Sequence, residues 1–416
     1  MNETNTLEFK ESVTKSFLKT VSAFANDAGG TIVFGVNDNG VTVGMENPDA
    51  AALDVENAIN DSIVPRPRYE LKVNRCAGTV TLKVYEGFHK PYLYHAKAYT
   101  RQGSATVEAD AFQLRRLLLE GQRINYEELP AHSQDLTFGI LESRLQEHLG
   151  IQAVTTDVLK TLELYSDKEG FNLAAEILAD ANSMPYLDIV RFGKTISVMR
   201  ERIILEGSSC LLQLEEAMKV FRRCYCYEEI SGLTREERQS IPEEAFREAL
   251  VNAIVHRAWD VQANIRVAMW DDRIEVTSPG GLPKGVTEEE YLSGHLSVLR
   301  NPILGNVFFR LGQIERLGTG VRRIREAYEG TGQSPVFTVS TNAIAVELPV
   351  LGSVGLQKDE QIVYATLKGN VLKSSVEVAE EAGFGKTKTV RLLQALQEKG
   401  LVRVAGAGRG TRYALA

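Results

Sequence analysis

Three polar side chains in the stretch EALVNAIVHR have the spacing of a reactive site. Glu248, Asn252 and His256 are four residues apart, so on a helix they lie along one face. A carboxylate and an amide on adjacent turns can position a water molecule and a magnesium ion. The opposite face is apolar, as packing of this helix on a core requires: Ala249, Leu250, Ala253 and Ile254.

Two glycine-containing turns follow this helix along the chain. PGGLP spans residues 279–283 and includes Gly281, and LGTGV spans residues 317–321. In the second turn, Gly318, Thr319 and Gly320 stand at the start of the helical pattern GVRRIREAYE. Backbone N–H groups at a helix N-terminus can bind a phosphate, so this turn is a predicted phosphate site.

Residues 356–416 carry a local excess of basic side chains, with ten Lys or Arg against six Asp or Glu in a chain of net charge −8. Three helical patterns, DEQIVYATLK, SVEVAEEA and KTKTVRLLQALQEKG, precede two short strands, LVRV and RYAL. This order is typical of a winged helix-turn-helix, which places a helix in the major groove of double-stranded DNA. A winged helix that serves only protein contacts or dimerisation is the alternative. The expected DNA contacts are Lys386, Lys388, Arg391, Arg409 and Arg412.

The composition of the whole chain is that of a globular protein. Its 416 residues predict two to four domains, and 44% of them are hydrophobic and 25% charged. The acidic total argues against nucleic acid covering the full length of the chain. The four cysteines lack the C-x-x-C spacing of a zinc or redox site. We find no signal-peptide pattern and no run of about 18 apolar residues, so we expect a cytoplasmic protein without a membrane segment.

Hydrophobic periodicity divides the rest of the chain. Residues 1–122 contain the strand patterns LEFK, GGTIVFGV, YELKVNR and GTVTLKVYE and the helical patterns KSFLKTVSAFAND and ADAFQLRRLLLEG. Residues 123–235 predict a connecting α/β region in which no chemistry is evident. Residues 236–352 begin with the helix of Glu248, where Ser240 and Glu243 form a capping-box pattern, and continue with the strands IRVAMW and RIEVTS.

EALVNAIVHR, IEVTSPGGLP and RNPILGNVFFRLGQIERLGTGVRRI together resemble the divergent GHKL-type ATPase domain of bacterial proteins labelled RecG-like or Schlafen-related regulators. The resemblance implies that ATP is the cofactor. Glu248 would then be the water-activating base and Asn252 the magnesium ligand, with Gly318 to Gly320 as the phosphate lid. His256 and Gly281 complete the expected nucleotide contacts.

The adenine contact departs from the family pattern. The superfamily uses an Asp before its glycine turn, and this sequence has none there, which leaves Thr277 or Glu275 as substitutes. A nucleotide-free dimer platform is the alternative. The sequence has no Walker A or helicase motif, so we exclude a RecG helicase.

ETNTLEFK, AFANDAGGTIVFGVNDNG and KPYLYHAKAYTRQGSAT together resemble the Schlafen AlbA-type domain, over about residues 1 to 120. In nuclease members of that family, two glutamates and an aspartate form the active site. The resemblance places them at Glu3, Glu8 and Asp38, as ligands of Mg²⁺ or Mn²⁺, with Lys10, Arg101 and Lys97 on the nucleic-acid backbone. The alternative is that these glutamates are ordinary surface carboxylates.

We therefore expect a multidomain α/β protein: an α+β Schlafen AlbA-type module (1–122), the connecting region (123–235), a GHKL-like α/β sandwich (236–352) and a winged helix-turn-helix (356–416). The leading hypothesis is a DNA-binding transcriptional regulator that couples ATP or another ligand to DNA occupancy. The first alternative is a metal-dependent nuclease acting on RNA or single-stranded DNA, with a role in phage defence. The second is a ligand-sensing oligomeric scaffold. By analogy with both families we expect a homodimer.

Overall fold

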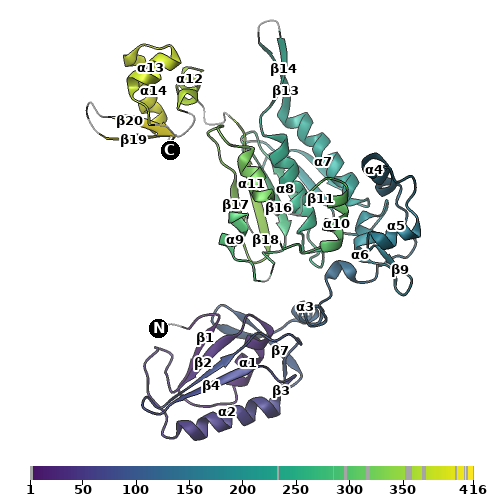
Figure 1. Cartoon of the computed structure of the whole chain (residues 1–416), viewed down its shortest axis with the longest axis vertical. Helices are drawn as coiled ribbons and strands as arrows, with labels where there is room; N and C mark the ends of the chain where they lie inside the picture. Colours follow the sequence, from purple (N-terminus) through teal and green to yellow (C-terminus); the bar gives the residue numbers. More distant parts are fainter. Residues whose placement is uncertain are drawn as a thin grey trace. The chain divides into compact units, whose positions relative to one another are not determined.

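The structure is a computed structural model, and it divides the chain into two compact units, Met1–Asn125 and Tyr126–Ala416 (Figure 1). Among the residues it describes, no helix is long and apolar enough to cross a membrane. The described residues are 3–231, 234–283, 285–294, 298–314, 319–351, 358–367, 372–398, 401–406, 408 and 411–415.

The first unit is built on a four-stranded sheet of order β1-β2-β5-β4, in which only the β1–β2 pair is parallel. Two helices pack their apolar residues against one face of this sheet. The elements are β1 (Leu7–Lys10), α1 (Phe17–Asn26), β2 (Gly30–Phe34), α2 (Pro48–Ser62), β4 (Tyr69–Asn74) and β5 (Thr79–Val84). All four predicted strands and the first predicted helix are present, whereas α2 was not predicted.

A second sheet, of order β3-β6-β7-β8, completes this unit. Its strands are β3 (Ile63–Val64), β6 (Leu93–Tyr94), β7 (Lys97–Gln102) and β8 (Ala105–Glu108), and α3 (Ala111–Gln122) follows. The side chain of Asp110 and that of Gln113 form a reciprocal cap at the start of α3, as the acidic residue before the predicted helix allows.

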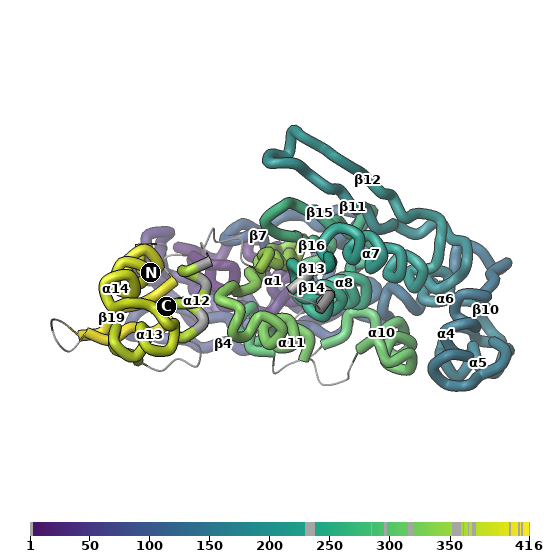
Figure 2. The backbone as a smooth tube through the Cα atoms, turned by 90° about the horizontal axis from the view of Figure 1, so that it is seen from above, coloured from purple at the N-terminus to yellow at the C-terminus, as the bar shows by residue number. Residues whose placement is uncertain are grey.

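The second unit is built on a six-stranded sheet of order β12-β11-β15-β16-β18-β17. The strands are β11 (Leu187–Phe192), β12 (Met199–Leu205), β15 (Ile265–Met269), β16 (Arg273–Pro279), β17 (Val336–Val339) and β18 (Ala343–Pro349). The β11–β12 hairpin projects beyond its neighbours (Figure 2). Since β11 pairs in parallel with β15, residues on both sides of position 235 share one sheet and one core. The boundary predicted at 235 therefore falls inside a continuous structure.

Most of the helices between residues 139 and 326 add buried residues to the core of this sheet, whereas Glu288–Ser293 adds none. The helices are α4 (Gly139–Leu149), α5 (Thr156–Thr161), α6 (Leu173–Leu178), α7 (Cys210–Tyr225), α8 (Glu243–Val255), α9 (Glu288–Ser293), α10 (Pro302–Arg310) and α11 (Gly320–Glu326). Shorter elements are the 3₁₀ turn η1 (Tyr126–Glu128), β9 (Tyr165–Ser166), β10 (Gly170–Phe171) and the hairpin of β13 (Cys226–Ser231) and β14 (Thr234–Gln239).

The start of α8 differs from the predicted capping box. Pro242 is the N-cap residue and has no side-chain cap, so the Ser240–Glu243 interpretation was wrong. The Gln239 side chain takes that role instead, because its Oε1 accepts a hydrogen bond from the Glu243 backbone N–H at 3.0 Å. A proline cannot supply a capping oxygen, and the chain recruits the amide three residues earlier.

The C-terminal segment has the element order predicted for it. It contains α12 (Lys358–Thr366), α13 (Ser375–Ala382), α14 (Lys386–Glu398) and the antiparallel pair β19 (Val402–Ala405) and β20 (Arg412–Leu415). Ser374 and Glu377 form a capping box at α13, and a small apolar core of its own joins the helices to the hairpin.

Candidate functional site: a cavity between α8 and β16

A cavity in the second unit brings together most of the residues predicted to hold a nucleotide. It contains about 1120 Å³ of space between its lining atoms, including the part open to solvent. Its polar lining includes Glu248, Asn252 and His256 from α8 and its C-terminal end, and Ser278 from β16. Aliphatic side chains supply much of the rest, among them Ala249, Val276, Leu299, Val321 and Val346. A mostly apolar cavity with a few polar groups is the usual form of a small-molecule site.

Glu248 is held inside the cavity by α8. Its side chain is buried, and it contacts Asn252 Nδ2 through Oε1 at 3.4 Å and Arg247 Nη2 through Oε2 at 3.3 Å. Burial raises the pKa of this carboxyl group, and the charges of Arg247 and Arg323 partly oppose that effect. A carboxylate with a raised pKa is a stronger proton acceptor than an ordinary surface glutamate.

The start of α11 packs directly against Glu248 and Asn252. A Cβ atom added to Gly320 would lie 2.4 Å from Asn252 Nδ2 and 2.8 Å from Glu248 Oε1. Only glycine fits at this position without moving the predicted base Glu248 or the predicted magnesium ligand Asn252. The structure therefore brings together Glu248, Asn252 and Gly320, which are separated by up to 72 positions in the sequence.

The two substitutes offered for the adenine contact do not reach the cavity. Thr277 and Glu275 bond to each other at 3.3 Å, and neither lines the cavity. Val276 and Ser278 line it instead, because successive side chains of a strand point to opposite faces. The sequence analysis missed Ser278. Side chains two positions apart on a strand share a face, so knowing that Val276 lines the cavity would have indicated Ser278 as well.

Ser278 faces the cavity with its proton already engaged. Its Oγ donates a hydrogen bond to the Ala253 carbonyl oxygen at 2.8 Å, and the residue is 8% exposed. A hydroxyl whose proton is engaged has only acceptor lone pairs left for a ligand. The group that Ser278 can bind in the cavity is therefore a donor, such as an exocyclic amine.

Three of the other four predicted cofactor residues line the cavity. His256, Gly281 and Thr319 all line the cavity. Burial, together with the nearby Arg300 charge, lowers the pKa of His256 to about 4, so the imidazole is neutral at pH 7. Gly318 lies outside the described residues.

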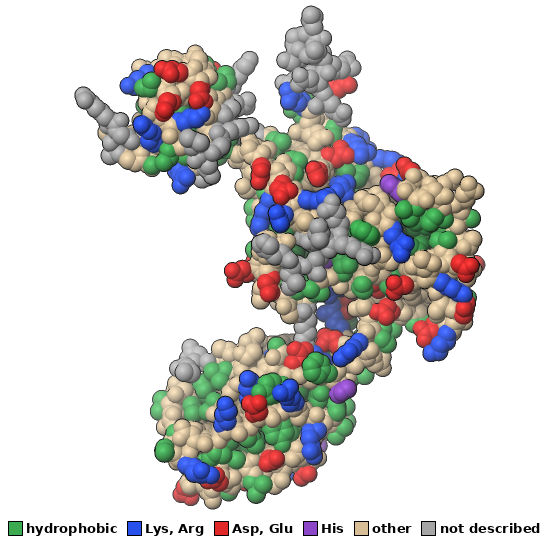
Figure 3. All heavy atoms as spheres, viewed as in Figure 1, with side chains coloured by type: hydrophobic (Ala, Val, Ile, Leu, Met, Phe, Trp, Pro, Cys, Tyr) green, Lys and Arg blue, Asp and Glu red, His purple; other side chains and the backbone are tan. Residues whose placement is uncertain are grey.

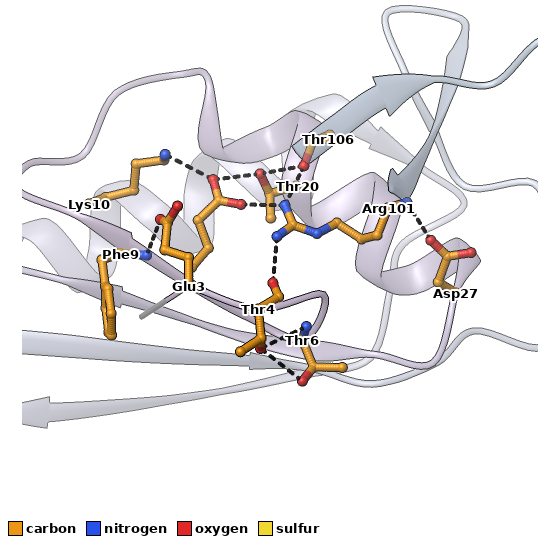
Figure 4. A network of polar contacts seen from close by, with 10 residues as sticks. Glu3, Thr4, Thr6, Phe9, Lys10, Thr20, Asp27, Arg101 and Thr106 are labelled. Atoms are coloured by element: carbon orange, nitrogen blue, oxygen red, sulfur yellow. Dashed lines mark hydrogen bonds and ion pairs between the residues drawn. The ribbon is translucent and has the colours of Figure 1, made fainter. Parts of the chain in front are cut away.

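The carboxylates of the first unit form a different kind of arrangement. Glu8 is buried and accepts contacts from three side chains, namely Thr20 Oγ1 at 3.0 Å, Lys10 Nζ at 2.9 Å and Arg101 Nη1 at 2.6 Å (Figure 4). The Arg101 side chain is 3% exposed and also bonds to Thr106. Both oxygens of Glu8 are therefore paired inside the fold.

Glu3 and Asp38 do not complete a metal site with Glu8. Glu3 Oε1 accepts a hydrogen bond from the Phe9 backbone N–H at 2.9 Å (Figure 4), and Asp38 is an exposed turn residue. Within the described ranges, no group of three His, Cys, Asp or Glu side chains could hold a metal ion. The predicted three-carboxylate centre is thus not assembled, since Glu8 is neutralised by Lys10 and Arg101.

Some of the predicted nucleic-acid contacts are already held in ion pairs within the protein, and others are exposed. Lys10 and Arg101 are bound to Glu8, and Lys97 forms an ion pair with Glu108 at 2.8 Å. In the C-terminal segment, Lys388 pairs with Asp359 at 2.7 Å and lies over the Phe384 ring. The exposed predicted contacts of that segment are Lys386, Arg391 and Arg412, and Arg409 lies outside the described residues.

Comparisons with known proteins agree with two of these regions. A family model described as "Schlafen, AlbA_2" matches residues 3–110. A model described as "Putative ATP-dependent DNA helicase recG C-terminal" matches residues 262–348, which begins after α8. No curated protein matches the chain.

Two solved structures are similar to the chain. The crystal structure of a Corynebacterium diphtheriae protein is 21% identical over 99% of this chain and 92% of that one, with a TM-score of 0.48. The solution structure of the N-terminal domain of a RecG-related protein from Nitrosomonas europaea is 30% identical over 24% of this chain and 78% of that one, with a TM-score of 0.17. By these family models, residues 3–110 are similar to Schlafen AlbA_2 domains, and residues 262–348 are similar to RecG C-terminal, HATPase-like domains.

Proposed function

We propose that this protein is a DNA-binding transcriptional regulator that binds an adenine nucleotide with Mg²⁺ in the cavity between α8 and β16. The observation that carries the proposal is the lining of that cavity. It combines the Glu248–Asn252 pair under Gly320 with apolar walls and an acceptor-only hydroxyl at Ser278.

Each lining group has a separate task in this proposal. The Asn252 amide nitrogen bonds to Glu248, so its amide oxygen is the atom that would bind the metal. Glu248 would accept a proton from an attacking water, which its raised pKa favours. Ser278 would accept a hydrogen bond from the amino group of adenine. A base with a keto oxygen at the same position would be disfavoured, because that oxygen and the Ser278 hydroxyl oxygen would both be acceptors.

The C-terminal segment supplies the proposed contact with double-stranded DNA. Lys386 and Arg391 are exposed on α14, the third helix of a winged-helix element order. Arg412 is exposed on β20 of the following hairpin. Cations on a helix and on a neighbouring hairpin can contact phosphates on both sides of a groove.

Calorimetric titration with Mg-ATP tests the nucleotide site. We expect saturable binding by the unmodified protein and a loss of about tenfold or more in affinity in Asn252→Ala, since an interaction of about 1.4 kcal/mol corresponds to tenfold. Gln146→Ala, on the exposed side of α4, is the matched amide control and should bind like the unmodified protein. Equal affinity in Asn252→Ala and the control would contradict the assignment.

Titration of a DNA duplex tests the second part of the proposal. Because phosphate contacts depend on cations, Lys386→Gln/Arg391→Gln should weaken duplex binding and reduce its salt dependence. Lys160→Gln/Lys168→Gln removes the same charge from exposed side chains of α5 and of the turn between β9 and β10, and it serves as the control. Equal losses in both double variants would show only a general charge effect and would remove the segment from the proposal.

A further inference from the structure

Helix α11 begins at the cavity and contacts whatever fills it. Its first residue, Gly320, packs against Glu248 and Asn252, and Val321 and Arg323 in the same helix line the cavity. A ligand in the cavity therefore lies against α11 itself. Because the hydrogen-bonded backbone makes a short helix move as one body, a displacement at its first turn also reaches its last residue.

The turn that follows α11 is fixed to the helix by side-chain hydrogen bonds. Tyr328 is 2% exposed, and its hydroxyl donates a hydrogen bond to the Pro349 carbonyl oxygen at the end of β18, at 2.9 Å. Thr331 Oγ1 donates to the Tyr328 carbonyl oxygen at 2.7 Å and accepts from the Gln333 backbone N–H at 3.2 Å. These bonds hold the chain on both sides of Gly332, so its position follows that of α11.

Gly332 packs against the first helix of the C-terminal segment. A Cβ atom added at this glycine would overlap the ring and the hydroxyl of Tyr364 in α12. Tyr364 is 9% exposed and belongs to the apolar core of the C-terminal segment, together with Val363 and Leu367 of the same helix. One face of Tyr364 is thus in contact with the turn after α11, while its helix forms part of the C-terminal core.

Helix α12 is joined in turn to α14, the helix that carries proposed DNA contacts. Asp359 of α12 pairs with Lys388 of α14 at 2.7 Å, and Leu393 and Leu396 of α14 lie in the same apolar core as Tyr364. Acidic and basic side chains are mixed on the visible face of the C-terminal segment (Figure 3). A shift of α12 therefore moves α14 or changes the ion pair of Lys388.

We propose that the contact between Gly332 and Tyr364 transmits nucleotide binding in the cavity to the C-terminal segment. The inference rests on the function proposed above and names the route by which the nucleotide site controls DNA binding. A ligand displaces α11, the turn after α11 carries the displacement to Tyr364, and α12 passes it to α14. The covalent chain that follows β18 is a different route, which substitutions at Gly332 leave unchanged.

Two glycines of this turn provide a matched comparison. Gly330 and Gly332 have φ angles of +69° and +78°, so an alanine strains the backbone to a similar extent at both positions. Nothing lies within 4 Å of a Cβ atom at Gly330, whereas Tyr364 occupies that space at Gly332. Gly332→Ala should therefore displace Tyr364, and Gly330→Ala is the control that keeps the contact.

The affinity of the full chain for a DNA duplex, with and without saturating Mg-ATP, tests the transmission. The two affinities should differ about fivefold or more in the unmodified protein and in Gly330→Ala, but less than about twofold in Gly332→Ala. Tyr364→Leu removes the contact from the other side and should reduce the ratio in the same way. Calorimetry should show Mg-ATP affinity within about twofold in every variant, since neither Gly332 nor Tyr364 lines the cavity. A ratio in Gly332→Ala equal to that of Gly330→Ala would overturn the proposal.

Hydrogen exchange of α12 tests the contact without nucleotide or DNA. The backbone N–H groups of α12 should exchange faster in Gly332→Ala than in Gly330→Ala, because the helix loses a packing contact. Equal exchange in the two variants would mean that Gly332 does not hold α12, which also overturns the proposal. Failure of the unmodified protein to bind Mg-ATP is a separate outcome, which would remove the proposed function and this inference with it. Thermal unfolding of each variant checks that the fold is retained.

Discussion

Glu248 and Glu8 are both buried glutamates, and their neighbours give them different roles. Glu8 is 6% exposed and has two cations within 3 Å, which fix its charge and its position. Glu248 is 5% exposed and faces a cavity, where it contacts the Asn252 amide and Arg247 and also feels the charge of Arg323. A carboxylate that is fully paired stabilises a fold, whereas one that is partly paired beside a cavity can exchange a proton.

Removing the partner of Glu8 should destabilise the first unit. Arg101→Met leaves a buried carboxylate without its main cation, so the free energy of unfolding should fall by about 3–5 kcal/mol. Lys97→Met breaks the exposed pair with Glu108 and should cost about 0–1 kcal/mol. Urea unfolding monitored by circular dichroism measures both. An equally small loss in the two variants would mean that the Glu8 network does not hold the fold together.

Gly320 should tolerate no side chain. Gly320→Ala places a methyl group against Asn252 and Glu248, so we expect a loss of about 1–3 kcal/mol in unfolding free energy and weaker Mg-ATP binding. Gly385→Ala is the control, since nothing lies within 4 Å of a Cβ atom at that glycine. Normal stability and normal nucleotide binding in Gly320→Ala would contradict the packing of α11 on the site.

The sequence was sufficient to identify candidate site residues, but it did not show which distant side chains would contact them. The spacing of Glu248 and Asn252 was sufficient to place both on one helix face, because that relation is local. The pairing of Glu8 with Arg101 joins residues 93 positions apart, and no pattern in a single sequence reports it. The face on which Ser278 lies also depends on the register of β16 with its neighbours.

Elements in the second unit are joined by buried polar contacts that the sequence analysis did not find. Glu127 of η1 is fully buried and caps α10, where its carboxyl oxygens accept the backbone N–H groups of Ile303 at 2.6 Å and Leu304 at 3.0 Å. The contact spans 176 positions and ties the start of this unit to a helix of its core. Burial raises the pKa of Glu127 to about 8, against the opposing effect of these two N–H donors.

This cap makes stability depend on pH in a defined direction. Between the ordinary pKa of 4.5 and the folded value of about 8, the folded state holds a proton on Glu127 that the unfolded state has lost. The Glu127 contribution to stability should therefore fall as pH rises through that range, by up to about 1.4 kcal/mol per pH unit. Glu127→Gln cannot titrate and should flatten the dependence. Parallel stability curves for the two proteins from pH 5 to 8 would rule out this titration.

Strands and helices with strong periodicity were predicted well, and connections between them were not. The four strands of the first sheet and the helices and hairpin of the C-terminal segment occur where alternation and helical spacing indicate them. The boundary at 235 failed as a break in the fold, because β11 pairs with β15 across it. Strand pairing over such a distance depends on tertiary packing, which local patterns do not report.

At the scale of the whole molecule, our proposal links the cavity between α8 and β16 to the C-terminal segment that we propose binds DNA. β18 lines the cavity through Ile344 and Val346 and is the last strand before that segment. If nucleotide binding changes the affinity for DNA, linkage requires that DNA change the affinity for nucleotide by the same factor.

The most direct test of this account is the affinity of the full chain for a DNA duplex, measured with and without saturating Mg-ATP. We predict a change of about fivefold or more in the unmodified protein, which corresponds to a coupling free energy of about 1 kcal/mol. Asn252→Ala should bind the duplex as the nucleotide-free protein does without Mg-ATP, and should need about tenfold or more Mg-ATP to reach the same change, because its nucleotide affinity is lower by that factor. An affinity that is the same with and without Mg-ATP in the unmodified protein, at a concentration where calorimetry shows the site filled, would contradict a nucleotide-controlled regulator.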